Sequence, residues 1–510
     1  MQLGRSSGIL LHPTSLPGPF GIGGLGREAR DFVGFLSRAR QSLWQVLPLG
    51  PTGYGDSPYQ GLSAFAGNPL LVDPGDLAED GLLDERDVVP PRGLHEERVD
   101  YEAVARAKAP LLDRAAARFF ASRRGSLSDE YDAFLAVHAA WLEDWALFAA
   151  LREEHGGRSW RDWPPALSRR SPAALDAART RLAPALDRAR FRQFAFFRQW
   201  TRLRRLAADA GVRLVGDMPI FVADDSCDAW SRPGQFLFDA EGRPTFVAGV
   251  PPDYFSATGQ LWGNPLYDWD AMALEGYGWW IERLRATLEL VDLVRIDHFI
   301  GFSRAWHVPA GDPDAMRGEW RPGPGDALFE ALGRALGRPL PIVAEDLGVV
   351  TPEVEALRDR HAQAGMKVLQ FAFSGDPANP FLPHAHGRRF FVYTGTHDND
   401  TTRGWFDSLA PAERSFVQRY LARSGEDVAW DLVRAAMGSV ADVAIVPMQD
   451  VLGLGSEARM NVPSSPSGNW AWRMAPGAAT EVHAARLAEA ATIYDRWPAA
   501  RAPRAASGEA

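Results

Sequence analysis

Short apolar runs rich in β-branched residues recur along the chain and alternate with segments of helical periodicity. Eight runs stand out, at residues 8–11, 44–49, 213–222, 293–299, 341–346, 368–373, 391–398 and 441–449. Several of them are continuously apolar, which is typical of strands buried on both faces of a parallel sheet. The pattern therefore predicts eight parallel strands.

Apolar residues spaced i, i+3, i+4 and i+7 mark amphipathic helices between these runs. Three stripes show this spacing: Ala29, Phe32, Val33 and Leu36; Tyr277, Trp280, Ile281, Leu284 and Leu288; Leu328, Phe329, Leu332 and Leu336. Eight strand–helix units predict an α/β fold of the (β/α)8 barrel type. Periodicity alone leaves an open doubly wound sheet as the alternative, whereas a solenoid or propeller is disfavoured because no repeat of 20–50 residues occurs.

The spacing between the predicted strands is uneven, which indicates large insertions after strands two, three and four. We predict one barrel domain over residues 1–498, interrupted by a mainly helical insertion at 51–207, a loop-and-helix insertion at 223–290 and a Gly- and Pro-rich loop at 301–325. Residues 499–510 are predicted to be a disordered tail. Because loops that follow barrel strands form the functional face, these insertions would wall a cleft there.

Composition and charge disfavour several classes of function for this chain. Of the 510 residues, 46% are hydrophobic and 24% charged, which are values of a globular chain. The net charge of −10 disfavours nucleic-acid binding and a polybasic membrane anchor. We find no signal-peptide pattern and no uninterrupted apolar run of transmembrane length. The single cysteine, Cys227, excludes an intrachain disulfide and fits a cytoplasmic location.

The 18 tryptophans are a further compositional feature. Most tryptophans serve in packing, but an indole ring also offers a flat apolar platform for a sugar, with an N–H that can bond a hydroxyl.

One glycine-rich segment matches the dinucleotide-binding pattern G-x-G-x-x-G, at residues 21–26. A true dinucleotide fingerprint turns directly from strand to helix and is followed about 20 residues later by an acid. Here residues 12–19, His-Pro-Thr-Ser-Leu-Pro-Gly-Pro, intervene, and the next strand ends without an acid. We therefore predict a loop and no cofactor.

Four carboxylic acids lie at or near the carboxyl ends of four predicted strands: Asp217, Asp297, Glu345 and Asp398. Each by itself is as compatible with a helix N-cap. Their convergence is the informative feature, because gathering ionised carboxylates in a fold is costly unless they are paired. Arg295 lies two residues before Asp297 on the same strand face, so we expect it to keep Asp297 ionised.

Several carboxylates without a metal motif favour glycosyl transfer. A retaining mechanism needs an ionised nucleophile and a second, protonated carboxyl group with a raised pKa. Glu345 follows an apolar strand, where desolvation would raise its pKa. Metal binding is the competing interpretation, but the spacing of His384, His386 and His397-Asp398 matches no zinc signature. A serine hydrolase is disfavoured because the chain has no G-x-S-x-G elbow.

Three loops combine Gly and Pro with aromatic and amide side chains that suit a sugar. They are residues 52–59, 250–264 and 461–470. The alternative for each is ordinary loop packing.

Several motifs together resemble the 4-α-glucanotransferases, also called amylomaltases or disproportionating enzymes, of the α-amylase-like retaining barrel enzymes. The central ones are Arg-Ile-Asp-His-Phe at 295–299, Ala-Glu-Asp-Leu-Gly at 344–348 and Thr-His-Asp-Asn at 396–399. Others are His-Pro-Thr-Ser-Leu-Pro-Gly at 12–18, Gly-Asp-Met-Pro-Ile-Phe-Val at 216–222 and Asn-Trp-Ala-Trp-Arg at 469–473. The resemblance spans residues 9–473.

The resemblance implies a role for each matching residue. Asp297 would be the nucleophile, Glu345 the general acid and then base, and Asp398 the acid that binds sugar hydroxyls and stabilises the transition state. Arg295 and His397 would orient the nucleophile and hold the same sugar. Further substrate-binding positions implied by the family are Ser57, Tyr59, Asp217, Trp262, His298 and Asn469, with Tyr254 and Phe255 on a loop over the cleft and Tyr54 at a second glucan site.

Two positions depart from some relatives, which carry an acid where this chain has Ala257 and Ser374. These departures concern sugar affinity and product size rather than the reaction. The family also lacks the C-terminal β-domain of amylases, and only about 40 residues follow Asn469 here.

The resemblance therefore implies a cytoplasmic enzyme that transfers α-1,4-glucan segments from maltooligosaccharides, amylose, starch or glycogen to an acceptor glucan or glucose, with intramolecular transfer giving cycloamyloses. It implies no cofactor and no metal, no nucleic-acid or membrane partner, and a monomer or weak homodimer. The rival interpretations are an α-glucan hydrolase with the same acids and a non-catalytic glucan-binding protein.

Overall fold

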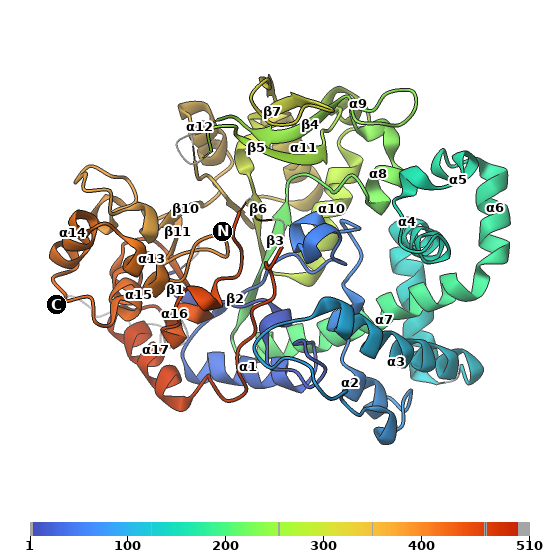
Figure 1. Cartoon of the computed structure of the whole chain (residues 1–510), viewed down its shortest axis with the longest axis horizontal. Coiled ribbons are helices and arrows are strands. Elements are labelled where there is room, and N and C mark those ends of the chain that lie inside the picture. The colour runs from blue at the N-terminus through green and yellow to red at the C-terminus, as the bar shows by residue number, and fades with distance from the viewer. Residues whose placement is uncertain are drawn as a thin grey trace, which may run out of the picture.

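Eight parallel strands form a barrel at the centre of the molecule (Figure 1). The computed structural model describes residues 4–123, 125–252, 256–348, 350–463, 465 and 467–497. In chain order the barrel strands are β1 (Ser6–Leu10), β2 (Leu43–Gln45), β3 (Arg213–Pro219), β6 (Leu293–Asp297), β9 (Ile342–Ala344), β10 (Gly365–Val368), β11 (Phe390–Tyr393) and β12 (Val443–Pro447). Neighbouring strands pair in the order β10-β11-β12-β1-β2-β3-β6-β9.

The sheet closes on itself between β9 and β10. A parallel bridge joins Val343 to Ala364, and the amide of Ala344 donates to the carbonyl of Ala364 at 2.8 Å. This confirms the predicted barrel and excludes the open sheet that periodicity had left as the alternative.

One strand prediction was wrong in position. The sequence placed the sixth strand at residues 368–373, but the strand is β10 at Gly365–Val368, and a short 3-10 helix follows at Leu369–Phe371. The run Leu369-Gln-Phe-Ala-Phe373 is as apolar as a strand because most of it is buried beyond the strand end, so hydrophobicity alone does not mark where the ladder stops.

Alternating residues of the barrel strands point inward and form a core of their own. Leu10, Leu43, Val215, Leu293, Val343, Met366, Val368, Phe391, Tyr393, Val443 and Ile445 belong to it. The residues between them, such as Leu214, Val294 and Val392, pack into the larger outer core. Both sets are buried, which explains the continuous apolar runs of these strands.

Helices that follow the barrel strands cover the outside of the barrel. They are α1 (Arg27–Arg38), α10 (Gly278–Leu290), α11 (Gly325–Leu336), α12 (Pro352–Arg360), α13 (Thr402–Ser408), α14 (Pro411–Leu421), α15 (Val428–Gly438), α16 (Met448–Leu452) and α17 (Glu481–Ile493). The predicted stripe of α1 is buried as expected, since Ala29, Phe32, Val33 and Leu36 are at most 3% exposed.

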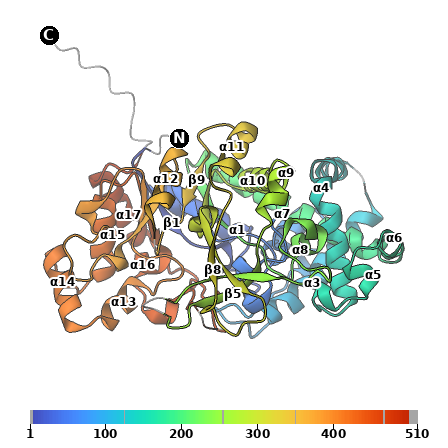
Figure 2. The same cartoon turned by 90° about the horizontal axis from the view of Figure 1, so that it is seen from above.

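A group of helices lies between β2 and β3. It comprises α2 (Pro74–Glu79), α3 (Tyr101–Ala121), α4 (Ser126–Glu154), α5 (Pro165–Ser168), α6 (Pro172–Arg181) and α7 (Ala183–Asp209). Both views place α4, α5 and α6 on the side of the barrel opposite α13 and α15 (Figures 1 and 2). Helix α4 is long and apolar enough to cross a membrane by length and composition, but it packs along α7 and buries Leu142, Ala146 and Leu147 in the outer core.

A second, antiparallel sheet follows strands β3 and β6, in segments where the sequence predicted loops and helices. Its strands β4 (Phe246–Val250), β5 (Gln260–Pro265), β7 (Arg304–Pro309) and β8 (Glu319–Pro322) pair in the order β5-β4-β7-β8, and the short helices α8 (Cys227–Ser231) and α9 (Trp269–Leu274) lie in the same segment. The sequence missed this sheet because its strands are short and only half buried, so their hydrophobic alternation is weak. The predicted tail, 499–510, lies outside the described residues.

The guanidinium of Arg496 ties the end of the described chain to the barrel. This residue is completely buried and donates hydrogen bonds of 2.7–3.2 Å to six backbone carbonyls. Ala436 and Met437 supply two of them from the last turn of α15, and Ser6 supplies another from the start of β1. The charge therefore stabilises one helix end and one strand together.

We predict that Arg496→Met lowers the free energy of unfolding by about 3 kcal/mol or more, because it removes the donor of six buried hydrogen bonds. Denaturant titration followed by tryptophan fluorescence measures this loss. As a control, Arg334→Met on α11, where the arginine side chain is 71% exposed, should change stability by no more than about 0.5 kcal/mol. Equal stabilities for the two variants would contradict the role of Arg496.

Candidate active site

Strand alternation brings the predicted acids together at the carboxyl end of the barrel. Asp217 follows the inward-facing Val215 by two residues, and Arg295 and Asp297 follow Leu293 by two and four. Glu345 likewise follows Val343 by two. Because side chains two apart share a face of a strand, all four polar groups point into the barrel where the strands end.

Arg295 joins two of these acids. Its Nη1 lies 2.8 Å from both carboxylate oxygens of Asp217, and its Nη2 lies 2.9 Å from Oδ1 of Asp297. The Arg295 side chain is only 4% exposed, whereas that of Asp297 is 32% exposed. Burial opposes the charge of Arg295, but the two carboxylates outweigh it and raise the pKa of the guanidinium above its ordinary value. A permanent positive charge therefore stands behind Asp297, which still faces the cleft.

Tyr59 and His397 form a stacked pair beside Asp217. Their ring centroids are 4.9 Å apart at 17°, and the Tyr59 hydroxyl lies 2.9 Å from Oδ2 of Asp217. Burial, reinforced by the charge of Asp217, raises the pKa of Tyr59, so its hydroxyl stays protonated and donates to the acid. Burial also raises the pKa of Asp217, and the Arg295 charge opposes that shift.

Glu345 occupies a different electrostatic setting from Asp297. Burial raises its pKa well above the ordinary range, and the negative charge of Asp297 adds to the shift, while Arg295 opposes it. The backbone N–H of His298 donates to Oε2 of Glu345 at 2.8 Å. His298 has a left-handed backbone, φ 52° and ψ 51°, an uncommon conformation for a residue other than glycine, and the sharp turn after β6 aims this amide at the acid.

Asp398 lies in the loop after β11, and its side chain is 44% exposed. Its Oδ2 is 3.4 Å from Nε2 of His397, and its Oδ1 accepts a hydrogen bond of 2.6 Å from the side-chain amide of Asn461. The site thus combines Asp297, which is paired with arginine, Glu345, whose pKa burial raises well above its ordinary range, and Asp398, which is held by a hydrogen bond. The contrast between Asp297 and Glu345 places two carboxyl groups with different surroundings in one cleft.

The structure places the remaining predicted residues at varying distances from this centre. Trp262 meets the ring of His298 edge-on at 4.7 Å, and burial lowers the pKa of His298 to about 4, so that imidazole is neutral. Ser57 caps the 3-10 helix that carries Tyr59, accepting from the Tyr59 amide at 3.2 Å. Tyr54 is 79% exposed.

The side chain of Asn469 forms hydrogen bonds within its own loop. Its Oδ1 accepts from the amide of Val462 at 2.9 Å, and its Nδ2 donates to the carbonyl of Ser465 at 3.0 Å. Tyr254 and Phe255, which we expected on a loop over the cleft, lie outside the described residues.

Three residues that belong to this centre were not among the predicted site positions. Trp470 packs against Tyr59 and His397, with centroids 5.5 and 5.8 Å away. Asn461 bonds Asp398, and Arg459 donates to the Asp398 carbonyl at 2.7 Å. The available signal was the loop 461–470, whose amides and aromatic ring suggested a sugar contact but not which strand end it would meet.

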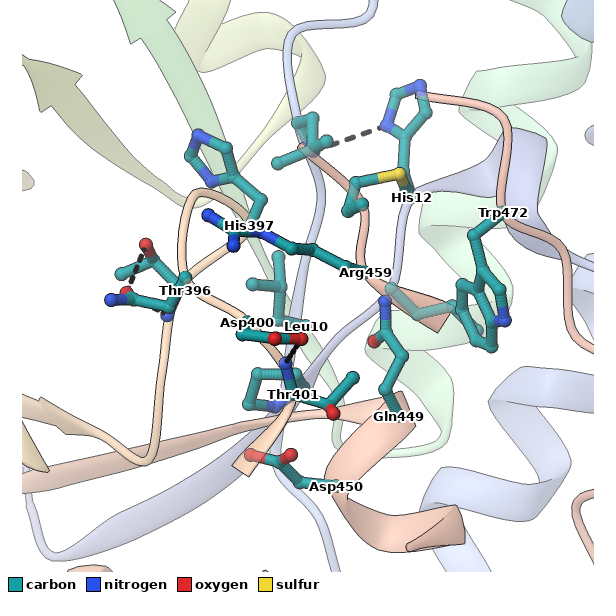
Figure 3. A pocket seen from close by; sticks show the side chains of 15 residues that line it. Leu10, His12, Thr396, His397, Asp400, Thr401, Gln449, Asp450, Arg459 and Trp472 are labelled. Atoms are coloured by element: carbon teal, nitrogen blue, oxygen red, sulfur yellow. Dashed lines mark hydrogen bonds between the residues drawn. The ribbon is translucent and has the colours of Figure 1, made fainter. Parts of the chain in front are cut away.

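A pocket adjoins the site behind His397 (Figure 3). Residues from β1, from the loop after β11 and from the segment after β12 line it, among them His12, Asp400, Gln449 and Arg459. Burial lowers the pKa of His12 to about 3, and its neutral Nδ1 accepts from the amide of Leu47 at 3.2 Å.

The histidines considered as metal ligands have other partners. His384 lies 3.0 Å from the Tyr420 hydroxyl, and His386 lies 2.7 Å from the Ser439 hydroxyl and 2.8 Å from the Phe381 carbonyl. Within the described part of the chain, no group of three or more metal-ligating side chains comes together.

Comparison with known proteins reveals relatives over nearly the whole chain. The profile of the 4-alpha-glucanotransferase family matches residues 11–479. A 4-alpha-glucanotransferase of Thermus thermophilus is 54% identical, covering 97% of this chain and 100% of the relative, and one of Synechocystis is 48% identical, covering 96% and 98%. The solved structure of amylomaltase from Streptococcus agalactiae in complex with acarbose matches with a TM-score of 0.93 at 38% identity, covering 96% of this chain and 99% of that one.

We predict that Asp297→Asn lowers the pKa of Glu345, because the substitution removes the negative charge that helps to keep Glu345 protonated. The pKa stays above its ordinary value, since burial is the larger cause. Titration of protein labelled with 13C at the glutamate carboxyl carbon measures the shift, and Glu345→Gln assigns the signal. An unchanged or higher pKa in Asp297→Asn would show that the two carboxyl groups do not interact.

Proposed function

The chain belongs to the 4-alpha-glucanotransferase family, and from this premise we propose that it transfers α-1,4-glucan segments by a retaining double displacement centred on Asp297 and Glu345. The observation that carries the mechanism is the contrast between the two acids. Arg295 stands 2.9 Å from Asp297 as a fixed counter-charge, whereas burial and the charge of Asp297 raise the pKa of Glu345. The first environment suits a nucleophile and the second a proton donor.

In the first step, an Asp297 oxygen attacks the anomeric carbon of the donor glucan. The glycosidic C–O bond breaks, and the departing 4-oxygen takes the Glu345 proton, so the shortened glucan leaves as an alcohol. The sugar is then held as an ester on Asp297, and Glu345 is left as a carboxylate. The charge of Asp297 is consumed in the ester, which removes the repulsion that had raised the pKa of Glu345.

In the second step, Glu345 acts as the base. It removes the proton from the 4-hydroxyl of the acceptor, whose oxygen attacks the anomeric carbon and displaces Asp297. The product is a new α-1,4 bond, and both acids return to their starting protonation. Two inversions at the same carbon give retention of configuration.

The surrounding residues hold the reacting sugar. Asp398 and His397 present a carboxylate and an imidazole on one wall of the cleft, with Asp398 binding sugar hydroxyls and stabilising the transition state. The Tyr59 hydroxyl fixes Asp217, so its ring is the part available for apolar contact with a sugar. Ser57, Trp262, His298 and Asn469 are proposed to line further sugar positions, Tyr254 and Phe255 to cover the cleft, and Tyr54, exposed on the surface, to bind a second glucan.

Transfer rather than hydrolysis requires that the acceptor sugar reach the intermediate before water does. We propose that the helices between β2 and β3 and the antiparallel sheet after β3 and β6 wall the cleft and limit the access of water. The amylomaltase of Streptococcus agalactiae was solved with acarbose, which supports a cleft for glucan-like ligands in this chain. We further propose a cytoplasmic enzyme, monomeric or weakly dimeric, that also closes long amylose chains into cycloamyloses.

We predict that the purified protein converts maltotriose, without added cofactor or metal, into glucose and a ladder of longer maltooligosaccharides, and amylose into products resistant to exo-acting glucoamylase. Chromatography by chain length follows both. Glucose and maltose alone would favour the hydrolase, and an unchanged substrate of either length would favour the binding protein.

Asp297→Asn should lower the rate of glucan transfer by roughly 10³-fold or more, whereas the surface variant Asp326→Asn on α11 should keep full activity.

We predict that Glu345→Gln accumulates a covalent glycosyl-enzyme when it is given α-maltosyl fluoride. Fluoride leaves without acid assistance, so Asp297 is still glycosylated, but the variant lacks the base that activates the acceptor. Intact mass spectrometry detects the added maltosyl group, and peptide mapping locates it. An adduct at another residue, or turnover of the fluoride with inversion and no adduct, would exclude the double displacement through Asp297.

A further inference from the structure

We propose that Asn461, held by Arg459, is a positioning residue that fixes the orientation of the Asp398 carboxylate for the transfer reaction. The proposal rests on the function proposed above, in which Asp398 stabilises the transition state. It assigns a role in the reaction to two residues of the segment after β12 that lie outside the barrel strands.

The carboxylate of Asp398 is held from both sides. The amide of Asn461 donates to Oδ1 at 2.6 Å, and His397 lies 3.4 Å from Oδ2. Since an ionised carboxylate only accepts hydrogen bonds, the NH2 group of Asn461 must face it. The Asp398 side chain is 44% exposed and so only partly restrained by packing, which makes the hydrogen bond from Asn461 important for its orientation.

Arg459 locks the backbones of the two partners together. Its Nε donates to the carbonyl of Asn461 at 2.7 Å, and its Nη2 donates to the carbonyl of Asp398, also at 2.7 Å. One planar guanidinium thus bridges the backbone carbonyls of both residues. The side-chain amide of Asn461 adds a third link, to the Asp398 carboxylate. Lysine cannot reproduce this bridge, because it lacks the rigid fork of donors.

The rest of the loop holds Asn461 in place. Asn469 bonds both the amide and the carbonyl of Val462, the residue next to Asn461, and the Trp470 amide donates to the carbonyl of Met460 at 2.7 Å. Trp470 in turn packs on Tyr59 and His397. Arg459 and His397 both line the pocket of Figure 3.

Removal of the Asn461 donor leaves the Asp398 carboxylate free to rotate away from the reacting sugar. The charged and titratable groups near Asp398 are His397, Arg459, through its bond to the Asp398 carbonyl, and Tyr59, whose pKa the Asp398 charge helps to raise. A carboxylate at position 461 would add a like charge in direct contact with Asp398 and would favour a proton shared between the two acids.

The test measures kcat, KM and pH profiles of glucan transfer for Asn461→Ala, Asn461→Asp and Arg459→Lys, with Ser467→Ala in the same loop as the control. We expect Asn461→Ala to lower kcat by about 10- to 100-fold with little change in KM, as for a contact that counts in the transition state. Arg459→Lys should lower kcat in the same way but less. Asn461→Asp should be less active than Asn461→Ala at neutral pH. Its pH optimum for transfer should be lower than that of the wild type, because a proton shared between the two acids restores the hydrogen bond at low pH.

A double-mutant cycle separates positioning from a general effect on folding. With α-maltosyl fluoride as donor, Asn461→Ala should add no further loss to Asp398→Asn, since Asn461 acts through Asp398. Circular dichroism and thermal unfolding identify any variant that does not fold. Asn461→Asp is nearly isosteric with the native residue, so it carries the test if Asn461→Ala does not fold.

Three results would overturn the proposal: wild-type kcat in both Asn461 variants, additive losses in the cycle, or an unshifted pH optimum in Asn461→Asp. Failure of the underlying function gives a different result, namely full activity in Asp398→Asn whatever the Asn461 variants do.

Discussion

The buried charge of Arg295 is the constraint on which the site depends. A guanidinium inside a barrel needs carboxylates to compensate it, and the structure supplies Asp217 below it and Asp297 toward the cleft. Both carboxylate oxygens of Asp217 accept hydrogen bonds from Arg295, and one also accepts from the Tyr59 hydroxyl. Asp297 keeps one side open to solvent. The requirement of a buried charge thus leaves a solvent-accessible carboxylate beside the arginine, and this carboxylate is the proposed nucleophile.

The same charges set the opposite state of Glu345. Asp297 disfavours a second ionised acid nearby, and burial adds to the effect, so the pKa of Glu345 lies well above the ordinary range. The left-handed turn at His298 brings a backbone N–H to this acid and at the same time ends β6 beside Asp297. Two carboxyl groups at the ends of neighbouring strands therefore have different electrostatic surroundings, one paired with arginine and one buried.

Segments far apart in the sequence complete the site. Tyr59 arrives from the loop after β2, His397 and Asp398 from the loop after β11, and Asn461 and Trp470 from the segment after β12. Stacking of Tyr59, His397 and Trp470 joins these three loops into one wall, and Arg459 joins two of them again through backbone carbonyls. The barrel supplies the direction of each loop, and side-chain contacts between loops supply the final geometry.

The sequence alone predicted eight parallel strands and identified the acids at their ends, with a barrel as the favoured fold and an open sheet as the alternative. Continuous apolar runs require strands buried on both faces, and polar residues that end such runs on the inward side, as Asp217, Arg295, Asp297 and Glu345 do, must meet at the carboxyl end of a closed parallel sheet. The resemblance of short motifs to the 4-α-glucanotransferases added the reaction, which the comparisons bear out.

Tertiary structure decided what local patterns do not encode. The ladder of β10 ends at Val368 although the chain remains apolar, because hydrogen bonding and not hydrophobicity ends a strand. The antiparallel sheet of β4, β5, β7 and β8 forms from short, half-buried strands with weak periodicity. The contacts of Asn461 and Trp470 arise from loop closure across some 60 and 400 residues of chain, and such pairings depend on where the whole fold places each loop rather than on its local composition.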